Sequence, residues 1–168
     1  MKKYRLTEET TKVGNRTLYR TLYRIQALRD FGNVKEGDIG GYIESEKNLS
    51  QDGNAWVSGD ARVYGNACVY GNACVYGNAR VSGDACVYGN ADIKTTGDIC
   101  SMSGFGSEYR TTTAFRTKNG DVHVSCGCFF GSLEEFCQRV ESTHGNNLYG
   151  REYKKMIEML KIHFEVEP

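Results

Sequence analysis

Residues 51–92 consist of seven uninterrupted copies of one six-residue motif, and this repeat constrains the fold more than any other feature of the chain. The copies read QDGNAW, VSGDAR, VYGNAC, VYGNAC, VYGNAR, VSGDAC and VYGNAD. Every copy has Gly third, Asn or Asp fourth and Ala fifth, and two degraded copies follow at 93–104. A short fixed period is typical of stacked repeats, in which each unit buries its apolar side against its neighbours.

Each position of the motif has a physical role. The first residue is Val in six of the seven copies, and a branched apolar side chain suits a buried, pleated surface. The fifth residue is always Ala, which fits where backbone crowds the interior. Gly followed by Asn or Asp is turn chemistry, because these residues tolerate positive φ. Each copy is therefore expected to be a short strand and a corner.

This pattern resembles the hexapeptide repeat of left-handed β-helices, which implies triangular coils of 18 residues. The predicted fold class is mainly β: a short left-handed parallel β-helix of about three coils at 51–104, an N-terminal β cap at 1–50 and a C-terminal ββαα domain at 105–168. With an 18-residue register, Asn54, Asn72 and Asn90 form one column and Asn66 lies beside Asp84, as expected of stacked polar ladders.

The N-terminal segment carries a second resemblance. Residues 22–28 alternate as a strand does, and Thr-Leu-Tyr-Arg occurs twice in tandem at 17–24, which is expected to extend a hairpin. The stretches that carry the resemblance are Tyr4-Arg5-Leu6, Asp30-Phe31, Asn33-Val34-Lys35, Gly40-Gly41-Tyr42 and Leu49-Ser50-Gln51. Through them, residues 3–55 resemble the start of the YdcK-like proteins. That family is grouped with transferases by fold, and the resemblance implies no catalytic residue in this chain.

After residue 104 the six-residue period is lost. Residues 111–117 and 122–128 are predicted to be strands that flank an Asn-Gly turn, which is a strong hairpin signal. A capping box that begins at Ser132 predicts a helix over 133–143, and apolar spacing predicts another over 149–163. The stretches Thr111-Thr112-Thr113, Cys126-Gly127-Cys128-Phe129 and Thr143-His144-Gly145 resemble a tail found in bacteriophage and gut-bacterial proteins.

Composition narrows the function classes. The chain has 21 basic and 21 acidic residues, which argues against a dedicated nucleic-acid binder or a polybasic membrane binder. It has neither an apolar run of roughly 18 residues nor a signal-peptide core. The seven cysteines are therefore expected to be reduced thiols in the cytoplasm.

The outward positions of the repeat supply the candidate binding residues. Trp56, Tyr70 and Tyr88 are expected to share one face, together with Cys74 and Asp92, and to form an interaction surface for a homotrimer, because aromatic residues anchor interfaces. A second face carries Arg62 and Arg80, a candidate anion site, with Asp98 next to them. A third face carries Cys68 and Cys86 with Tyr64.

Three C-terminal residues are further candidates: Cys126, Cys128 and His144. The Cys-x-Cys spacing places both thiols on one face of a strand and His123 on the other. The usual structural zinc spacing is Cys-x-x-Cys, so neither a metal nor another cofactor is expected. A Cys128 nucleophile oriented by His144 is the enzymatic alternative.

These features favour a non-enzymatic binding or assembly protein. One version is a phage-encoded modulator that binds a host defence protein or sequesters a small nucleotide ligand. The alternative is an acyltransferase of the hexapeptide-repeat class, which normally has a histidine base near its helix. All three histidines of this chain, His123, His144 and His163, lie beyond the repeat, and fold alone does not give function.

Overall fold

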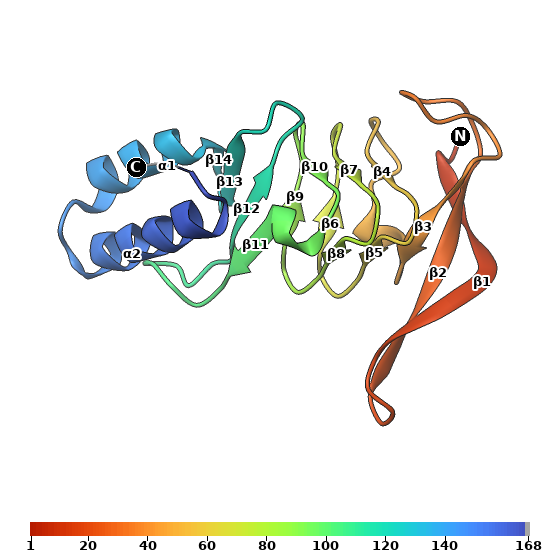
Figure 1. Cartoon of the computed structure of the whole chain (residues 1–168), viewed down its shortest axis with the longest axis horizontal. Helices are drawn as coiled ribbons and strands as arrows, with labels where there is room; N and C mark the ends of the chain where they lie inside the picture. Colours follow the sequence, from red (N-terminus) through yellow and green to blue (C-terminus); the bar gives the residue numbers. More distant parts are fainter. Residues whose placement is uncertain (167–168) are drawn as a thin grey trace.

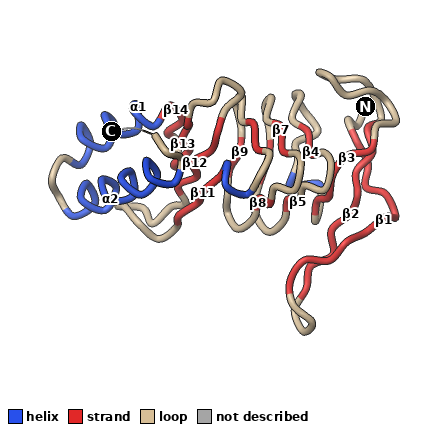
Figure 2. Tube along the Cα trace, in the orientation of Figure 1, coloured by secondary structure: helices blue, strands red, loops and turns tan. Residues whose placement is uncertain are grey.

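The structure is a computed structural model that describes residues 1–166. The molecule is elongated, with an antiparallel hairpin at one end, the repeats in the middle and two helices at the other end (Figure 1). Figure 2 shows strands and loops with short helical turns in the hairpin and the repeats, and the two long helices at the other end of the molecule.

The N-terminal hairpin is formed by β1 (Tyr4–Gly14) and β2 (Tyr19–Ala27). The first Thr-Leu-Tyr-Arg copy lies at its tip, where Gly14 pairs with Tyr19 and Val13 with Arg20. The hairpin extension predicted from the tandem copies is therefore confirmed. β2 then pairs antiparallel with β3 (Ile39–Ile43). β3 in turn pairs parallel with the repeat strand at Arg62–Val63.

Each repeat contributes one strand of two residues. These strands are β4 (Trp56–Val57), β5 (Arg62–Val63), β6 (Cys68–Val69), β7 (Cys74–Val75), β8 (Arg80–Val81), β9 (Cys86–Val87) and β10 (Asp92–Ile93). Every parallel pair among them joins residues 18 apart, so the predicted register is confirmed. Asn54 donates a side-chain hydrogen bond to Asn72 at 3.1 Å, and Asn66 donates one to Asp84 at 2.9 Å, as the ladders require.

The motif builds this region as its chemistry suggests. The third-position glycines of all seven copies have φ between 63° and 73°, a conformation that glycine adopts without a steric penalty. The first-position Val and fifth-position Ala side chains are buried in one continuous core. Two short 3-10 helices flank the strands, η1 (Glu46–Asn48) and η2 (Thr96–Asp98).

The predicted fold class, a mainly β chain built around a single left-handed β-helix, is wrong. The repeat strands are divided among three small sheets, in the orders β10-β7-β4, β6-β9 and β1-β2-β3-β5-β8, and the last of these is mixed parallel and antiparallel. Each repeat strand pairs with the repeat strand 18 residues away, so consecutive strands belong to different sheets. The architecture is a mixed one, with several small sheets and two helices.

The C-terminal part also has more strands than the predicted ββαα arrangement. It forms a four-stranded antiparallel sheet of β11 (Ile99–Met102), β12 (Thr112–Arg116), β13 (Val122–Cys126) and β14 (Phe129–Ser132). The first of these strands comes from the degraded repeat, and the last one leads directly into a helix. The two predicted helices are confirmed as α1 (Leu133–His144) and α2 (Leu148–His163).

The helices and this sheet enclose a second core, separate from that of the repeats. Phe136 and Val140 of α1 and Tyr153, Ile157 and Leu160 of α2 are buried in it, which confirms the faces predicted from their spacing. Within residues 1–166, no helix combines the length and the apolar character needed to cross a membrane.

Candidate functional site

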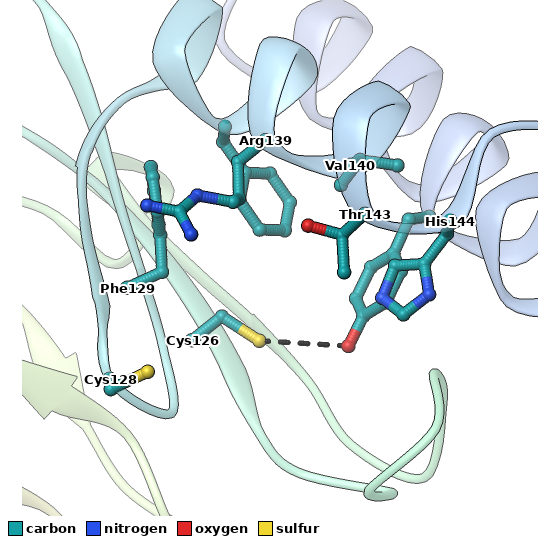
Figure 3. Close-up of a pocket in the computed structure, with 9 residues that line it drawn as sticks. Cys126, Cys128, Phe129, Arg139, Val140, Thr143 and His144 are labelled. Atoms are coloured by element: carbon teal, nitrogen blue, oxygen red, sulfur yellow. Dashed lines mark hydrogen bonds between the residues drawn. The ribbon is translucent and has the colours of Figure 1, made fainter.

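A pocket of about 220 Å³ opens in the C-terminal part between the β13–β14 turn and α1, with α2 at its back (Figure 3). Its lining residues are Cys126, Cys128, Phe129, Phe136, Arg139, Val140, Thr143, His144 and Tyr153. The three C-terminal residues singled out from the sequence, Cys126, Cys128 and His144, are therefore brought together in one cavity.

The two thiols reach the pocket from different local structures. Cys126 is the last residue of β13, whereas Cys128 lies in the turn after it and is exposed. Gly127, with φ of 59°, reverses the chain so that Cys126 pairs with Phe129. The prediction that both thiols lie on one face of a strand is therefore wrong, because the strand ends before Cys128.

Helix α1 begins with the predicted capping box. The Glu135 amide donates to the Ser132 hydroxyl at 3.1 Å, and the Ser132 amide donates to the Glu135 carboxylate at 2.7 Å. This box fixes the start of α1 and hence the phase of its faces. Arg139 and Thr143, one helical turn apart, point into the pocket beside the thiols (Figure 3).

Tyr153 of α2 forms the back wall of the pocket. Its ring stacks on His144 with centroids 5.6 Å apart and meets Phe136 edge to face at 5.7 Å. Its hydroxyl lies 3.8 Å from Cys126 Sγ (Figure 3), and burial raises the pKa of Tyr153 to about 12. The Tyr153 hydroxyl therefore stays protonated at neutral pH.

Some polar groups of the pocket have hydrogen-bond partners within the protein, and others are free to bind a ligand. Cys126 Sγ accepts a hydrogen bond from the Thr112 hydroxyl at 3.2 Å, so this thiol is held by hydroxyl groups rather than by a base. Arg139 forms no ion pair with any of the residues described in the structure. An unpaired guanidinium beside aromatic rings suits an anionic ligand with a planar part.

A second hollow continues the first. It has a volume of about 610 Å³ and shares Cys128, Phe129 and Arg139 with the pocket. Arg139 therefore stands between the two spaces. Neither Arg139 nor Tyr153 was predicted to be a site residue. Arg139 lies beside the buried Val140 on α1, and Tyr153 is itself a buried position of α2, so helical spacing marks Tyr153 as a core residue.

His123 lies away from this pocket, as its place in the strand predicts. Its ring is 5.4 Å from that of Phe130. Among residues 1–166, no three His, Cys, Asp or Glu side chains are grouped so that they could hold a metal ion.

The aromatic face predicted on the repeats is not assembled as expected. Trp56 is only 7% exposed and packs edge to face against Tyr4 and Phe31. Tyr70 and Tyr88 instead stack on each other, with centroids 4.6 Å apart, on the sheet that carries Cys68 and Cys86 rather than on that of Trp56.

The reason is the position of the corner within the motif. The chain turns at the third and fourth positions, so a strand runs from the sixth position of one copy into the second position of the next. Tyr70 consequently belongs with Cys68, and Tyr64 belongs with Arg62. The prediction grouped each sixth position with the second position of its own copy, which lies on the other side of a corner.

Arg62 and Arg80 are direct partners in β5 and β8, as predicted. Arg80 is exposed, whereas Arg62 Nε is buried without a hydrogen-bond partner in the described part of the chain. Asp98 does not join them, because its carboxylate accepts hydrogen bonds from the Lys94 and Thr95 amides at 3.1 and 2.7 Å. An anion at this pair stays a prediction.

Comparison with known proteins gives one partial match. The chain is 41% identical over 61 residues to a protein of Escherichia coli (strain K12) described as "Uncharacterized acetyltransferase YdcK", and the match covers 34% of this chain and 19% of that protein. No family model matches the sequence. The chain thus spans about a fifth of the length of this relative, and the resemblance to YdcK-like proteins is supported for that part alone.

Proposed function

We propose that this chain is a non-enzymatic binding protein whose C-terminal pocket takes a small anionic ligand with a planar ring, the chemistry of a nucleotide. The observation that carries the proposal is the unpaired Arg139 guanidinium at a cavity walled by His144 and Tyr153. Guanidinium groups bind phosphate with two parallel hydrogen bonds, and aromatic rings stack on bases.

The size of the site is consistent with such a ligand. The pocket of about 220 Å³ is smaller than a typical drug-sized site of roughly 300–1,000 Å³, so it has room for one ring or one phosphate. The adjoining hollow of about 610 Å³ gives the other half of a mononucleotide a place on the opposite side of Arg139.

Binding is favoured over catalysis by the surroundings of Cys126, the thiol that contacts Tyr153. A cysteine nucleophile needs a base within hydrogen-bond reach, and Cys126 contacts the hydroxyls of Thr112 and Tyr153 instead. The His144 ring is stacked on Tyr153. In the role we propose, the protein is a phage-encoded modulator in the cytoplasm that sequesters a nucleotide signal; a host defence protein is the other partner that its sequence suggested.

Calorimetry with AMP, cyclic AMP and inorganic phosphate tests this function. We expect saturable binding of at least one of these probes and a loss of about tenfold or more in Arg139→Ala, since charge-assisted hydrogen bonds contribute about 1.5–3 kcal/mol. Arg151→Ala is the matched control, because Arg151 is exposed on α2 and does not line the pocket. Equal affinity in the two variants, or no binding of any probe at millimolar concentration, would exclude the proposal.

Acetyl transfer is the second candidate, favoured by the description of the Escherichia coli relative as an acetyltransferase. A general base must come within about 2.6–3.2 Å of the proton that it removes. Two histidines lie on the repeat side of the C-terminal part: His163, whose Nε2 is 3.0 Å from the Gly97 carbonyl oxygen, and His123 beside Phe130.

We expect no binding of acetyl-coenzyme A in calorimetry. Micromolar binding, with turnover on an amine acceptor that His163→Ala or His144→Ala abolishes, would instead assign the chain to the acetyltransferases. The two histidine variants separate a base at the last repeat from one in the C-terminal pocket.

A further inference from the structure

Cys68 and Cys86 hold equivalent positions in two stacked repeats and face each other across the β6–β9 sheet. They are direct partners in parallel register, and their Sγ atoms are 3.0 Å apart. Neighbouring parallel strands are separated by about 4.8 Å, which lies within the Cα separation of about 4.4–6.8 Å that disulfides span. A disulfide bond needs the two sulfur atoms to approach by about 1 Å more, to about 2.05 Å.

The chemistry of the pair is asymmetric. The pKa of the Cys86 thiol is lowered to about 6, chiefly by its hydrogen bond with the Cys68 thiol, and the Tyr70 hydroxyl acts in the same direction. The pKa of Cys68 is raised by the same hydrogen bond and by burial. Because the two thiols are hydrogen-bonded to each other, one stabilises the thiolate of the other, which is the nucleophilic form of cysteine; the lowered pKa favours Cys86 in that role.

We propose that Cys68 and Cys86 form a redox-modification site, at which a peroxide converts the two thiols into a disulfide that joins neighbouring repeats. The Cys86 thiolate attacks one peroxide oxygen, the O–O bond breaks, and the hydroxide that leaves takes up a proton to become water. The product is a sulfenic acid on Cys86.

Cys68 then completes the reaction. Its thiol loses a proton and attacks the Cys86 sulfur, the S–O bond breaks, and a second water leaves with that proton. In total, two thiols are oxidised to one disulfide while one hydrogen peroxide is reduced to two waters. A thiol reductant reverses the change, as expected of redox-sensing disulfides in a reducing compartment.

The geometry gives the site selectivity over the other thiols. Cys74 has the same local sequence as Cys68, VYGNAC, but it lies in β7 on a different sheet. Its Sγ contacts the Asn72 carbonyl oxygen at 3.8 Å rather than a second sulfur. Cys74 therefore provides a matched control within the repeat itself.

The disulfide would covalently join two stacked repeats on the β6–β9 sheet. It would link two residues that are 18 positions apart in the sequence. The linked strands lie directly beside the stacked rings of Tyr70 and Tyr88. This cross-link restricts the unfolded chain, so the oxidised protein should melt at a higher temperature than the reduced one.

Peptide mapping of the oxidised full chain tests the proposal. The reduced protein is treated with hydrogen peroxide, its remaining thiols are blocked with N-ethylmaleimide, and it is cleaved with trypsin. Cleavage after Arg62, Arg80 and Lys94 releases peptide 63–80, with Cys68 and Cys74, and peptide 81–94, with Cys86. The Cys74→Ser variant leaves Cys68 as the sole cysteine of the first peptide.

We expect the two peptides to be joined in the unchanged protein and in Cys74→Ser, and to be separate in Cys68→Ser. Peptides that stay unlinked in folded, peroxide-treated Cys74→Ser would overturn the proposal, and so would a link that persists in Cys68→Ser. Circular dichroism confirms that each variant is folded, and the Cys74→Ser result decides the matter even if Cys68→Ser does not fold.

Discussion

The Tyr88 ring of the repeats packs in a tilted arrangement against the Phe130 ring of β14, with centroids 4.2 Å apart and an interplanar angle of 31°. This contact continues the stack of Tyr70 on Tyr88 from the repeats into the C-terminal sheet. Gly89 makes room for it, because a Cβ at that position would lie 2.7 Å from Phe130 Cζ. The contact adds to others between the two parts, since Phe115 of β12 packs in the core of the repeats and Ala91 pairs with Thr117.

Removing this ring should loosen the junction. We expect Phe130→Ala to lower the free energy of unfolding by about 1–2 kcal/mol, since the ring is partly exposed and loses both apolar burial and stacking. Urea denaturation followed by circular dichroism measures the change. Leu18→Ala, at the exposed tip of the hairpin, serves as the control and should change the free energy by less than about 0.5 kcal/mol.

The first-position Val residues should be essential to the repeats. Val69 is fully buried, so Val69→Asp loses about 1.5–3 kcal/mol of apolar burial and adds the penalty of an unpaired buried charge. We expect most of the chain to be unfolded. Cys68→Ser, on the outward position beside it, should lower the melting temperature only slightly. Similar melting losses in the two variants would show that the inward and outward positions are misassigned.

Lys3 gives the stability a pH dependence. Its ammonium is buried and donates to the Ala55 carbonyl oxygen at 2.9 Å, and burial lowers its pKa from 10.5 to about 8. Between these two values the unfolded chain binds more protons than the folded one, so the contribution of Lys3 to stability rises with pH from about 8 toward 10.5.

The Lys3→Met variant isolates this contribution from the other titrating groups. We expect the unfolding free energy of the unchanged protein, measured relative to that of Lys3→Met, to increase by about 1 kcal/mol between pH 7 and pH 9. Urea titrations of both proteins at the two pH values provide the comparison. A difference that stays constant or decreases with pH would mean that the Lys3 amine is not destabilised as an ammonium in the folded state.

The homotrimer stays a prediction, and fewer aromatic residues are available for its interface than the sequence suggested. Trp56 is occupied by Tyr4 and Phe31, and Tyr70 on the β6–β9 sheet is the most exposed of the three aromatic residues predicted to form the surface. We therefore expect association to use the Tyr70 side. We expect a trimeric mass in light scattering at micromolar concentration and a smaller mass for Tyr70→Glu, because a charge there opposes apolar contact. A monomeric mass for the unchanged protein would remove this idea.

Much of the local structure could be predicted from the sequence, because it depends on contacts between near neighbours. The six-residue period fixes which side chains are buried and where glycine must adopt positive φ, and the ladder from Asn54 to Asn72 follows from the 18-residue register. The capping box at Ser132 places the start of α1. The candidate residues Cys126, Cys128 and His144 could also be identified from the sequence, because their side chains are reactive and lie outside the repeat.

Other features depended on where the corners lie and on contacts between distant segments. The motif alone did not show that Tyr70 shares a face with Cys68, since this follows from the position of the turn. The repeat period alone also did not show that β3 and the hairpin extend one of the three small sheets. The pocket forms because α2 packs Tyr153 against His144 and Cys126, and only the tertiary structure brings Arg139 beside them.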